Sequence, residues 1–214
     1  MSDAKKIMEM IKEHDITYVD LRFTDIAGKM QHVTQHIDTI DEDALTEGFM
    51  FDGSSIAGWK AINESDMTLM PDLYRAYVDP FFAQPTLALF CDVLEPSSGE
   101  AYDRDPRGTA KAAIAHIETL GIADTAFFGP EAEFFIFEDV KIDVSMNRGL
   151  YSVDSVEGPY NSARNYGEGN LGHRPGVKGG YFPVPPVDSG QDIRSEMVSV
   201  MADMGVAVEK HHHE

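Results

Sequence analysis

The sequence predicts an α+β fold, and three observations lead to this prediction. Apolar residues in the first fourteen positions follow helical spacing, whereas those from residue 19 to 23 alternate with polar ones as in a strand. The run from Thr86 to Val93 is too apolar for an exposed face, which is typical of a buried strand. A second helical stripe follows Pro106, so helices and strands are mixed along the chain.

In the first hundred residues we expect a small α+β unit. The predicted elements are a helix ending near His14, a hairpin whose second strand covers Met30–Thr34, a short helix over Asp41–Glu47, and strands over Met67–Met70 and Thr86–Val93. The Pro- and Ser-containing stretch at 96–100 marks a boundary, because a strong helix start follows it. We therefore place two domains at residues 1–104 and 105–214.

The second half begins with the clearest helix signal of the chain, Asp105 as N-cap with Pro106 at the first helical position. The apolar stripe of this helix runs to Leu120, and Gly121 ends it. Further expectations are strands over 125–128, 131–137 and 206–209, no regular structure from 144 to 190, and a helix whose apolar face starts at 193 and which ends before 205.

Composition and charge restrict the possible partners. Of the 214 residues, 43% are hydrophobic and 25% charged, which excludes a disordered or collagen-like chain. Lys and Arg number 17 against 37 Asp and Glu, a formal net charge of −20. Such a surface repels phosphate backbones and anionic membranes, so we expect no nucleic-acid and no membrane partner. The same acidity suits a protein that collects cations.

We expect a cytoplasmic protein with a buried, unreactive thiol. The N-terminal residues contain no apolar stretch of signal-peptide length, and nothing approaches the roughly 20 apolar residues of a membrane span. The single cysteine, Cys91, lies in an apolar run, where a structural thiol is expected rather than a nucleophile.

Two acids in the stretch 128–135 are candidate metal ligands. Glu131 and Glu133 are two residues apart, so on a strand they share a face, with Cα atoms about 7 Å apart. Carboxylates in this arrangement can serve one cation or two neighbouring ones. An exposed strand that merely carries acids is the alternative, although the same face continues into Phe135 and Phe137.

The C-terminal run repeats this pattern with histidines. If residues 206–214 form a strand, His212 and Glu214 share one face while Glu209 and His211 take the other. Together with Glu131 and Glu133, Glu214 could complete a three-carboxylate set for two Mg²⁺ or Mn²⁺ ions. The alternative is the remnant of a histidine tag, but tags are usually longer and the preceding residues read as a natural strand.

The loop around Asp52 contains two glycines, two serines and the only tryptophan. Taken alone it predicts a turn in which Asp52 bonds its own backbone. It is not a phosphate-binding P-loop, and the chain holds neither a G-x-G-x-x-G fingerprint nor a G-x-S-x-G nucleophile elbow. Any nucleotide must therefore be bound by a different structural motif.

Five short stretches together carry a family resemblance. They are Phe51–Ile56 with Gly58 and Trp59, Glu64–Met67, Phe128–Phe135, Lys178–Pro183 and His211–Glu214. Several motifs in this order are far more specific than any one alone. They resemble bacterial type I glutamine synthetase, the ATP-dependent glutamate–ammonia ligase, over essentially the whole chain. The family's fold is an N-terminal β-grasp domain followed by a catalytic α+β domain. This chain would contain the β-grasp domain and the beginning of the catalytic domain.

The resemblance also implies ligands for two metal ions per site, Mg²⁺ or Mn²⁺, and for the nucleotide. By position, Glu131 would bind the ion near the ATP phosphates, and Glu133 and Glu214 the ion near glutamate. Glu209 and His212 match positions that contact the nucleotide.

For the ammonium entrance, the resemblance implies that Asp52 receives ammonium and removes its proton, with Tyr181 lining the same entrance. Ser55 and Asp66 would hold the Asp52 loop. Glutamate, ammonium and ATP are the implied substrates, and glutamine forms through γ-glutamyl phosphate.

Assembly and length are the last implications. Family members form homo-oligomers of two stacked six-membered rings, and each active site lies between neighbouring subunits, so the Asp52 loop would complete the adjacent site. Family chains continue well past the His-His-His-Glu motif, and we interpret these 214 residues as the front part of such a chain, inactive alone. Two alternatives are a non-catalytic fragment or relative that keeps fold and metal sites only, and a γ-glutamyl ligase for a larger amine.

Overall fold

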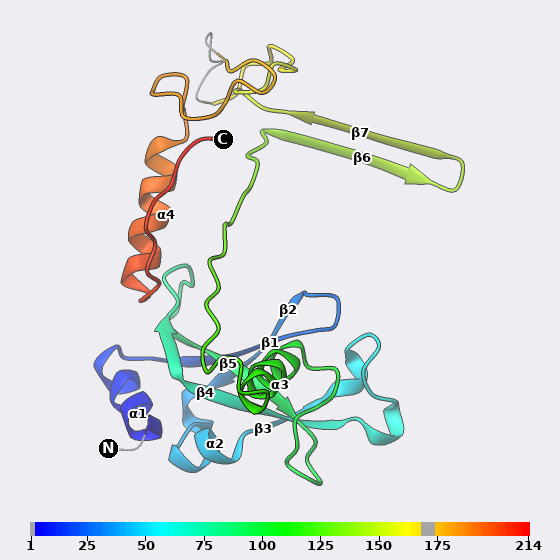
Figure 1. Ribbon diagram of the computed structural model, residues 1–214, viewed down its shortest axis with the longest axis vertical. Helices are drawn as coiled ribbons and strands as arrows, with labels where there is room; N and C mark the ends of the chain where they lie inside the picture. The colour runs from blue at the N-terminus through cyan, green and yellow to red at the C-terminus, as the bar shows by residue number, and fades with distance from the viewer. Residues whose placement is uncertain (1–2, 168–173) are drawn as a thin grey trace. The chain divides into compact units, whose positions relative to one another are not determined.

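A computed structural model of the chain describes residues 3–167 and 174–214. The chain divides into two compact units, Met1–Phe128 and Gly129–Glu214 (Figure 1). This division groups the helix that follows residue 104 with the N-terminal unit. The predicted domain boundary after residue 104 stays a prediction.

The N-terminal unit is built on a mixed five-stranded sheet. Its strands are β1 (Tyr18–Thr24), β2 (Met30–His36), β3 (Phe49–Asp52), β4 (Asp66–Val78) and β5 (Thr86–Leu94), in the order β2-β1-β5-β4-β3. The central pair β1–β5 is parallel, and the other pairs are antiparallel. The helices are α1 (Asp3–Glu13), α2 (Glu42–Glu47) and α3 (Pro106–Thr119), with the 3₁₀ turns η1 (Ile37–Thr39), η2 (Gly53–Ser55) and η3 (Ile62–Glu64).

Alternation along β1 separates the two faces of this sheet. Val19, Leu21 and Phe23 are buried in the hydrophobic core that the apolar side of α1 also enters, as the sequence predicts. Asp20 and Arg22 lie on the opposite face. The predicted hairpin to β2 is confirmed, and Asp25 closes its turn by accepting hydrogen bonds from two backbone N–H groups.

β4 is much longer than the predicted strand over Met67–Met70. Its pairing with β5 is regular up to Pro71, shifts register between Pro71 and Ala76, and resumes to Val78. A proline cannot donate to the ladder and is tolerated at such an irregularity. The strand continues past the point where the alternation of the sequence stops because β5 supplies partners on both sides of the bulge.

α3 confirms the predicted helix start. The fully buried Asp105 accepts hydrogen bonds from the backbone N–H of Arg107, Gly108 and Val93, so it caps the helix and ties it to β5. The apolar stripe is largely exposed, with Ile114 and Leu120 38% and 54% accessible. An ion pair between Arg107 and Asp92 on β5 also joins α3 to the sheet.

The C-terminal unit departs from prediction in its strands. It contains a long two-stranded hairpin, β6 (Asp139–Ser145) and β7 (Arg148–Asp154). The end of β6 and all of β7 lie in the stretch 144–190 that the sequence predicted to lack regular structure. The predicted strands over 125–128 and 131–137 are wrong, because no neighbouring strand pairs with them in the described residues (Figure 1). The predicted strand over 206–209 is wrong for the same reason.

The last helix, α4 (Gln191–Asp203), is confirmed. After Gly205, which has a φ of +80°, the chain reverses and runs back beside α4, so that His211 contacts Arg194 and Ser195 (Figure 1). This reversal brings the C-terminal histidine run to the beginning of the helix.

Candidate functional site

The Asp52 turn presents an exposed, ionised carboxylate. β3 ends at Asp52, and Oδ1 accepts hydrogen bonds from Ser54 N and Ser54 Oγ at 2.8 and 2.6 Å. The Ser54 hydroxyl and then the Ser54 N–H hold the pKa of Asp52 below its usual value. The predicted turn with a self-bonding aspartate is confirmed.

Two further predicted residues lie beside this carboxylate. Ser55 Oγ is 3.4 Å from Asp52 Oδ2, and the register of β3 with β4 places Asp66 opposite Asp52. Gly53 N donates to Ser65 O at 2.7 Å, and a Cβ on the buried Gly53 would collide with the Met67 side chain. The turn is therefore packed directly onto the core, which restricts how Asp52 moves.

In the C-terminal unit, the histidine run packs against the segment that contains Tyr181. The His212 ring lies edge-on to Tyr181 and Phe182, with centroids 5.3 and 4.5 Å away, and Phe182 N donates to His213 O. A Cβ on Gly180 would come within 3.0 Å of Glu214 O, so glycine permits this approach. The structure thus brings Tyr181, His212 and the backbone of Glu214 together.

His213 is held at both ring nitrogens. Nδ1 lies 2.6 Å from Gly180 O and Nε2 lies 2.9 Å from Glu157 Oε2, and its side chain is only 15% exposed. Burial opposes the protonation of His213, but the hydrogen bond to Glu157 and that to the Gly180 carbonyl outweigh it, so its pKa is raised. Burial likewise opposes ionisation of Glu157, but hydrogen bonds from Ser189 and His213 bring its pKa below the usual value.

The predicted metal ligands are not gathered in the described residues. Glu131 and Glu133 are exposed on the extended segment before β6, and Glu214 is exposed at the end of the histidine run. Within residues 3–167 and 174–214, no group of three or more His, Cys, Asp or Glu side chains is arranged to hold a metal ion. The three carboxylates have the oxygen chemistry that Mg²⁺ and Mn²⁺ prefer, and their exposure leaves them open to a cation. The metal assignment and the assignment of the exposed Glu209 to the nucleotide stay predictions.

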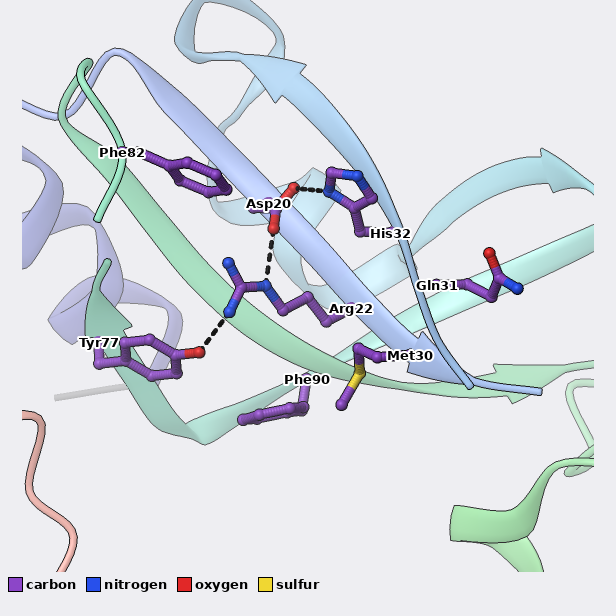
Figure 2. A pocket seen from close by; sticks show the side chains of 8 residues that line it. All are labelled: Asp20, Arg22, Met30, Gln31, His32, Tyr77, Phe82 and Phe90. Atoms are coloured by element: carbon purple, nitrogen blue, oxygen red, sulfur yellow. Dashed lines mark hydrogen bonds and ion pairs between the residues drawn. The ribbon is translucent and has the colours of Figure 1, made fainter. Parts of the chain in front are cut away.

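A separate cavity of about 420 Å³ lies on the face of the N-terminal sheet that carries Asp20 and Arg22 (Figure 2). In its wall the fully buried Asp20 bonds Arg22 Nε at 2.7 Å and His32 Nδ1 at 2.6 Å, and Arg22 also reaches Tyr77 and Asp79. The cavity also contains Met30, Gln31, Phe82 and Phe90. None of the predicted site residues lines it, and its charged groups are satisfied by one another.

Sequence reasoning missed Glu157, which connects three segments of the C-terminal unit. The residue stands in a Val-Glu-Gly-Pro stretch that reads as an ordinary turn, and its partners Ser189 and His213 are 32 and 56 positions away. No local pattern encodes such distant contacts, so no signal in this one sequence could have identified it.

No helix in the part of the chain described by the structure is long and apolar enough to cross a membrane.

Family models match nearly the whole chain. The model described as the glutamine synthetase β-grasp domain matches residues 15–96, and that of the glutamine synthetase catalytic domain matches residues 103–214. Residues 97–102 lie between the two matched ranges.

Curated relatives agree with these models. A glutamine synthetase of Azospirillum brasilense is 66% identical over all 214 residues, and one of Rhizobium meliloti is 61% identical over the same length. The chain covers 46% of each, so it spans about half the length of the curated relatives that it matches. Among solved structures, the cryo-EM structure of Plasmodium falciparum glutamine synthetase superposes with a TM-score of 0.82 at 24% identity, covering the whole chain and 42% of that protein. This last likeness shows the fold.

Proposed function

Because the chain belongs to the glutamine synthetase family, we propose that the protein that contains it is an ATP-dependent glutamate–ammonia ligase of the cytoplasm. The observation that supports this most is the match of the chain, over its whole length, to relatives of that name at up to 66% identity. The predicted α+β fold with a β-grasp domain and the start of the catalytic domain is confirmed by the two family models.

The proposed reaction has two steps. The γ-carboxylate of glutamate attacks the γ-phosphorus of ATP and releases ADP, which leaves γ-glutamyl phosphate. Ammonia then attacks the activated carbonyl, and phosphate leaves. Neutral ammonia is the nucleophile, so ammonium must first lose a proton.

Asp52 is the proposed proton acceptor for ammonium. Its carboxylate is exposed and ionised, and hydrogen bonds from Ser54 keep it so while the Gly53 contact packs the turn on the core. An anion at this position attracts the cationic substrate before it accepts the proton. Tyr181 is proposed to line the same entrance, and Ser55 and Asp66 to hold the Asp52 loop.

Glu131, Glu133 and Glu214 are the proposed ligands for two Mg²⁺ or Mn²⁺ ions, which would neutralise charge on the transferring phosphoryl group. Glu209 and His212 are proposed to contact the nucleotide. The packing of His212 against Tyr181 and Phe182 supports a defined orientation of its ring.

The proposed assembly is a homo-oligomer of two stacked six-membered rings in which each Asp52 loop completes a neighbouring site. Because the chain covers 46% of the length of its relatives, we propose that these 214 residues do not form glutamine alone. Glutamate- and ammonium-dependent phosphate release by the pure 214-residue chain would contradict this.

Asp52→Asn in the intact protein tests the assignment. Loss of a positioned general base typically costs 10²–10⁴-fold, so ammonium-dependent phosphate release should fall by at least about 100-fold, whereas ATP binding stays unchanged. Asp43→Asn, an exposed aspartate on α2, is the matched control and should retain full activity.

A substrate panel distinguishes the alternatives. Ammonium should be preferred over methylamine and diamines; a preference for a larger amine indicates a different γ-glutamyl ligase. No glutamate-dependent phosphate release from the intact wild type indicates a non-catalytic relative and overturns the proposed function.

A further inference from the structure

Glu157 lies where three separate segments of the C-terminal unit meet. Its Oε1 accepts hydrogen bonds from Ser189 N and Ser189 Oγ at 2.9 and 2.5 Å, just before α4. Its Oε2 bonds His213 Nε2 at 2.9 Å. Glu157 itself follows β7, so one carboxylate ties the hairpin, the start of α4 and the histidine run together.

The histidine run has its second anchor on the Tyr181 segment. His213 Nδ1 lies 2.6 Å from Gly180 O, and the His213 carbonyl accepts from Phe182 N at 3.2 Å. His213 is therefore fixed through its ring and its backbone. Because it stands between His212 and Glu214, its position restricts the directions that both neighbours can take.

We infer that Glu157 is a positioning residue: it holds His213 and thereby places His212 and Glu214 for nucleotide and metal. This inference rests on the proposed function, in which those two neighbours contact nucleotide and metal. Residues that hold a metal ligand in place without touching the metal orient that ligand, and their loss typically costs 10–100-fold in metal affinity or activity.

A second link supports the same role. Asp188, beside Ser189, is buried and pairs with Arg194 at 2.5 Å, and Arg194 Nε donates to His211 Nδ1 at 3.2 Å. His211 is thus bound directly to Arg194 of α4, and His213 is bound through Glu157 to Ser189, which precedes the helix. Of these two links, the one through Glu157 reaches His213, the residue next to Glu214.

The test is a double-mutant cycle in the intact protein, read by Mn²⁺ affinity in calorimetry, which needs no turnover. Glu157→Ala and His213→Ala should each weaken Mn²⁺ binding about tenfold, and the double variant should be no worse than either alone. The KM for ATP and the KM for glutamate should both rise in the same variants, because His212 is proposed to contact the nucleotide and Glu214 to bind the ion near glutamate. Glu196→Ala, an exposed glutamate on α4, is the control and should change none of these values.

Glu157→Gln keeps the size of the side chain and carries the test if the alanine variant does not fold. Its amide retains one acceptor oxygen, so the loss of Mn²⁺ affinity should be smaller than for alanine. Unchanged Mn²⁺ affinity in the Glu157 variants, or additive losses in the cycle, would overturn the positioning role.

The same measurements separate this inference from the proposed function. A wild type that forms no glutamine but shows the coupled loss of Mn²⁺ affinity overturns the ligase and keeps the positioning role. A wild type that forms glutamine with an additive cycle does the reverse. A wild type that binds no Mn²⁺ overturns both.

Discussion

The two units of this chain are stabilised in different ways. Every buried hydrophobic side chain among the described residues lies between Ala4 and Tyr102, in the N-terminal unit. Among the described residues of the C-terminal unit, the buried polar or charged side chains are Asp154, Ser155 and Asp188, while apolar ones such as Ile142 and Val144 are more than 70% exposed.

The contrast shows that the N-terminal unit has a core of its own, whereas polar contacts organise the described part of the C-terminal unit. Apolar burial is the main favourable term in folding, so we expect the N-terminal unit to unfold cooperatively. The C-terminal unit should open locally, because hydrogen bonds to exposed loops contribute little net free energy.

The largest expected effect concerns the N-terminal core. Leu89→Ala removes a fully buried side chain from the central strand β5, and the free energy of unfolding should fall by about 3 kcal/mol. Urea unfolding followed by fluorescence of Trp59 measures it, because the single tryptophan is 7% exposed in this same core. Ile142→Ala, at a side chain 72% exposed on β6, should shift the curve by less than about 0.5 kcal/mol. Equal losses in both variants would contradict the comparison.

A smaller effect is expected at the buried cap of α3. Asp105→Ala leaves three backbone N–H groups without their acceptor, and the N-terminal unit should lose about 2 kcal/mol in the same urea experiment. Asp41→Ala removes the exposed cap of α2, which accepts from Ala44 N, and should cost about half as much. An unchanged urea midpoint for Asp105→Ala would show that the cap does not join α3 to this core.

The smallest expected effect is the loss, at low pH, of the local stabilisation that the hydrogen bonds to Asp154 give the C-terminal unit. Asp154 accepts hydrogen bonds from the Ser162 hydroxyl, from Tyr166 OH and from Ser162 N, and these lower its pKa to about 2. Because the folded pKa lies below the unfolded value of about 3.9, the stabilisation is complete above that value and is lost as the pH falls towards 2.

The protection of the Ser162 amide against hydrogen exchange, corrected for the intrinsic rate, measures this loss. It should decrease between about pH 4 and pH 2 while the N-terminal unit keeps its protection. Asp154→Asn should show weaker protection that no longer changes over this range. Constant protection of Ser162 in the wild type from pH 5 to pH 2 would contradict the assignment.

Local sequence signals predicted the elements with clear start and stop residues. The Asp105–Pro106 start of α3, the alternation of β1, the Gly205 stop of α4 and the buried setting of Cys91 are all confirmed, and burial raises the pKa of that thiol to about 12. The hairpin β6–β7 was missed, although Val140, Ile142 and Val144 alternate with polar residues, which is the pattern of a strand. In the structure these three side chains are exposed.

The sequence predicted the local structure of some residues of the candidate site correctly and that of others wrongly. The turn chemistry of Asp52 is local, so a loop of Asp, Gly and Ser predicts it, and the structure confirms the self-bonding turn. Strand pairing for Glu131 and Glu133 was inferred from residue types alone and is absent in the described residues. A strand exists only where another segment offers hydrogen-bond partners, which residue types do not report.

By itself the sequence determined the α+β class, the N-terminal helix–hairpin order, the Asp52 turn and the motifs through which the family is identified. Each of these depends on neighbours within a few residues or on an ordered set of short motifs. Only the tertiary structure decided that Glu157 holds His213, that Asp20 is buried under Arg22, and that the His212 ring lies against Tyr181. These contacts join residues that are distant along the chain or across strands, and only folding brings their atoms within hydrogen-bond or van der Waals distance.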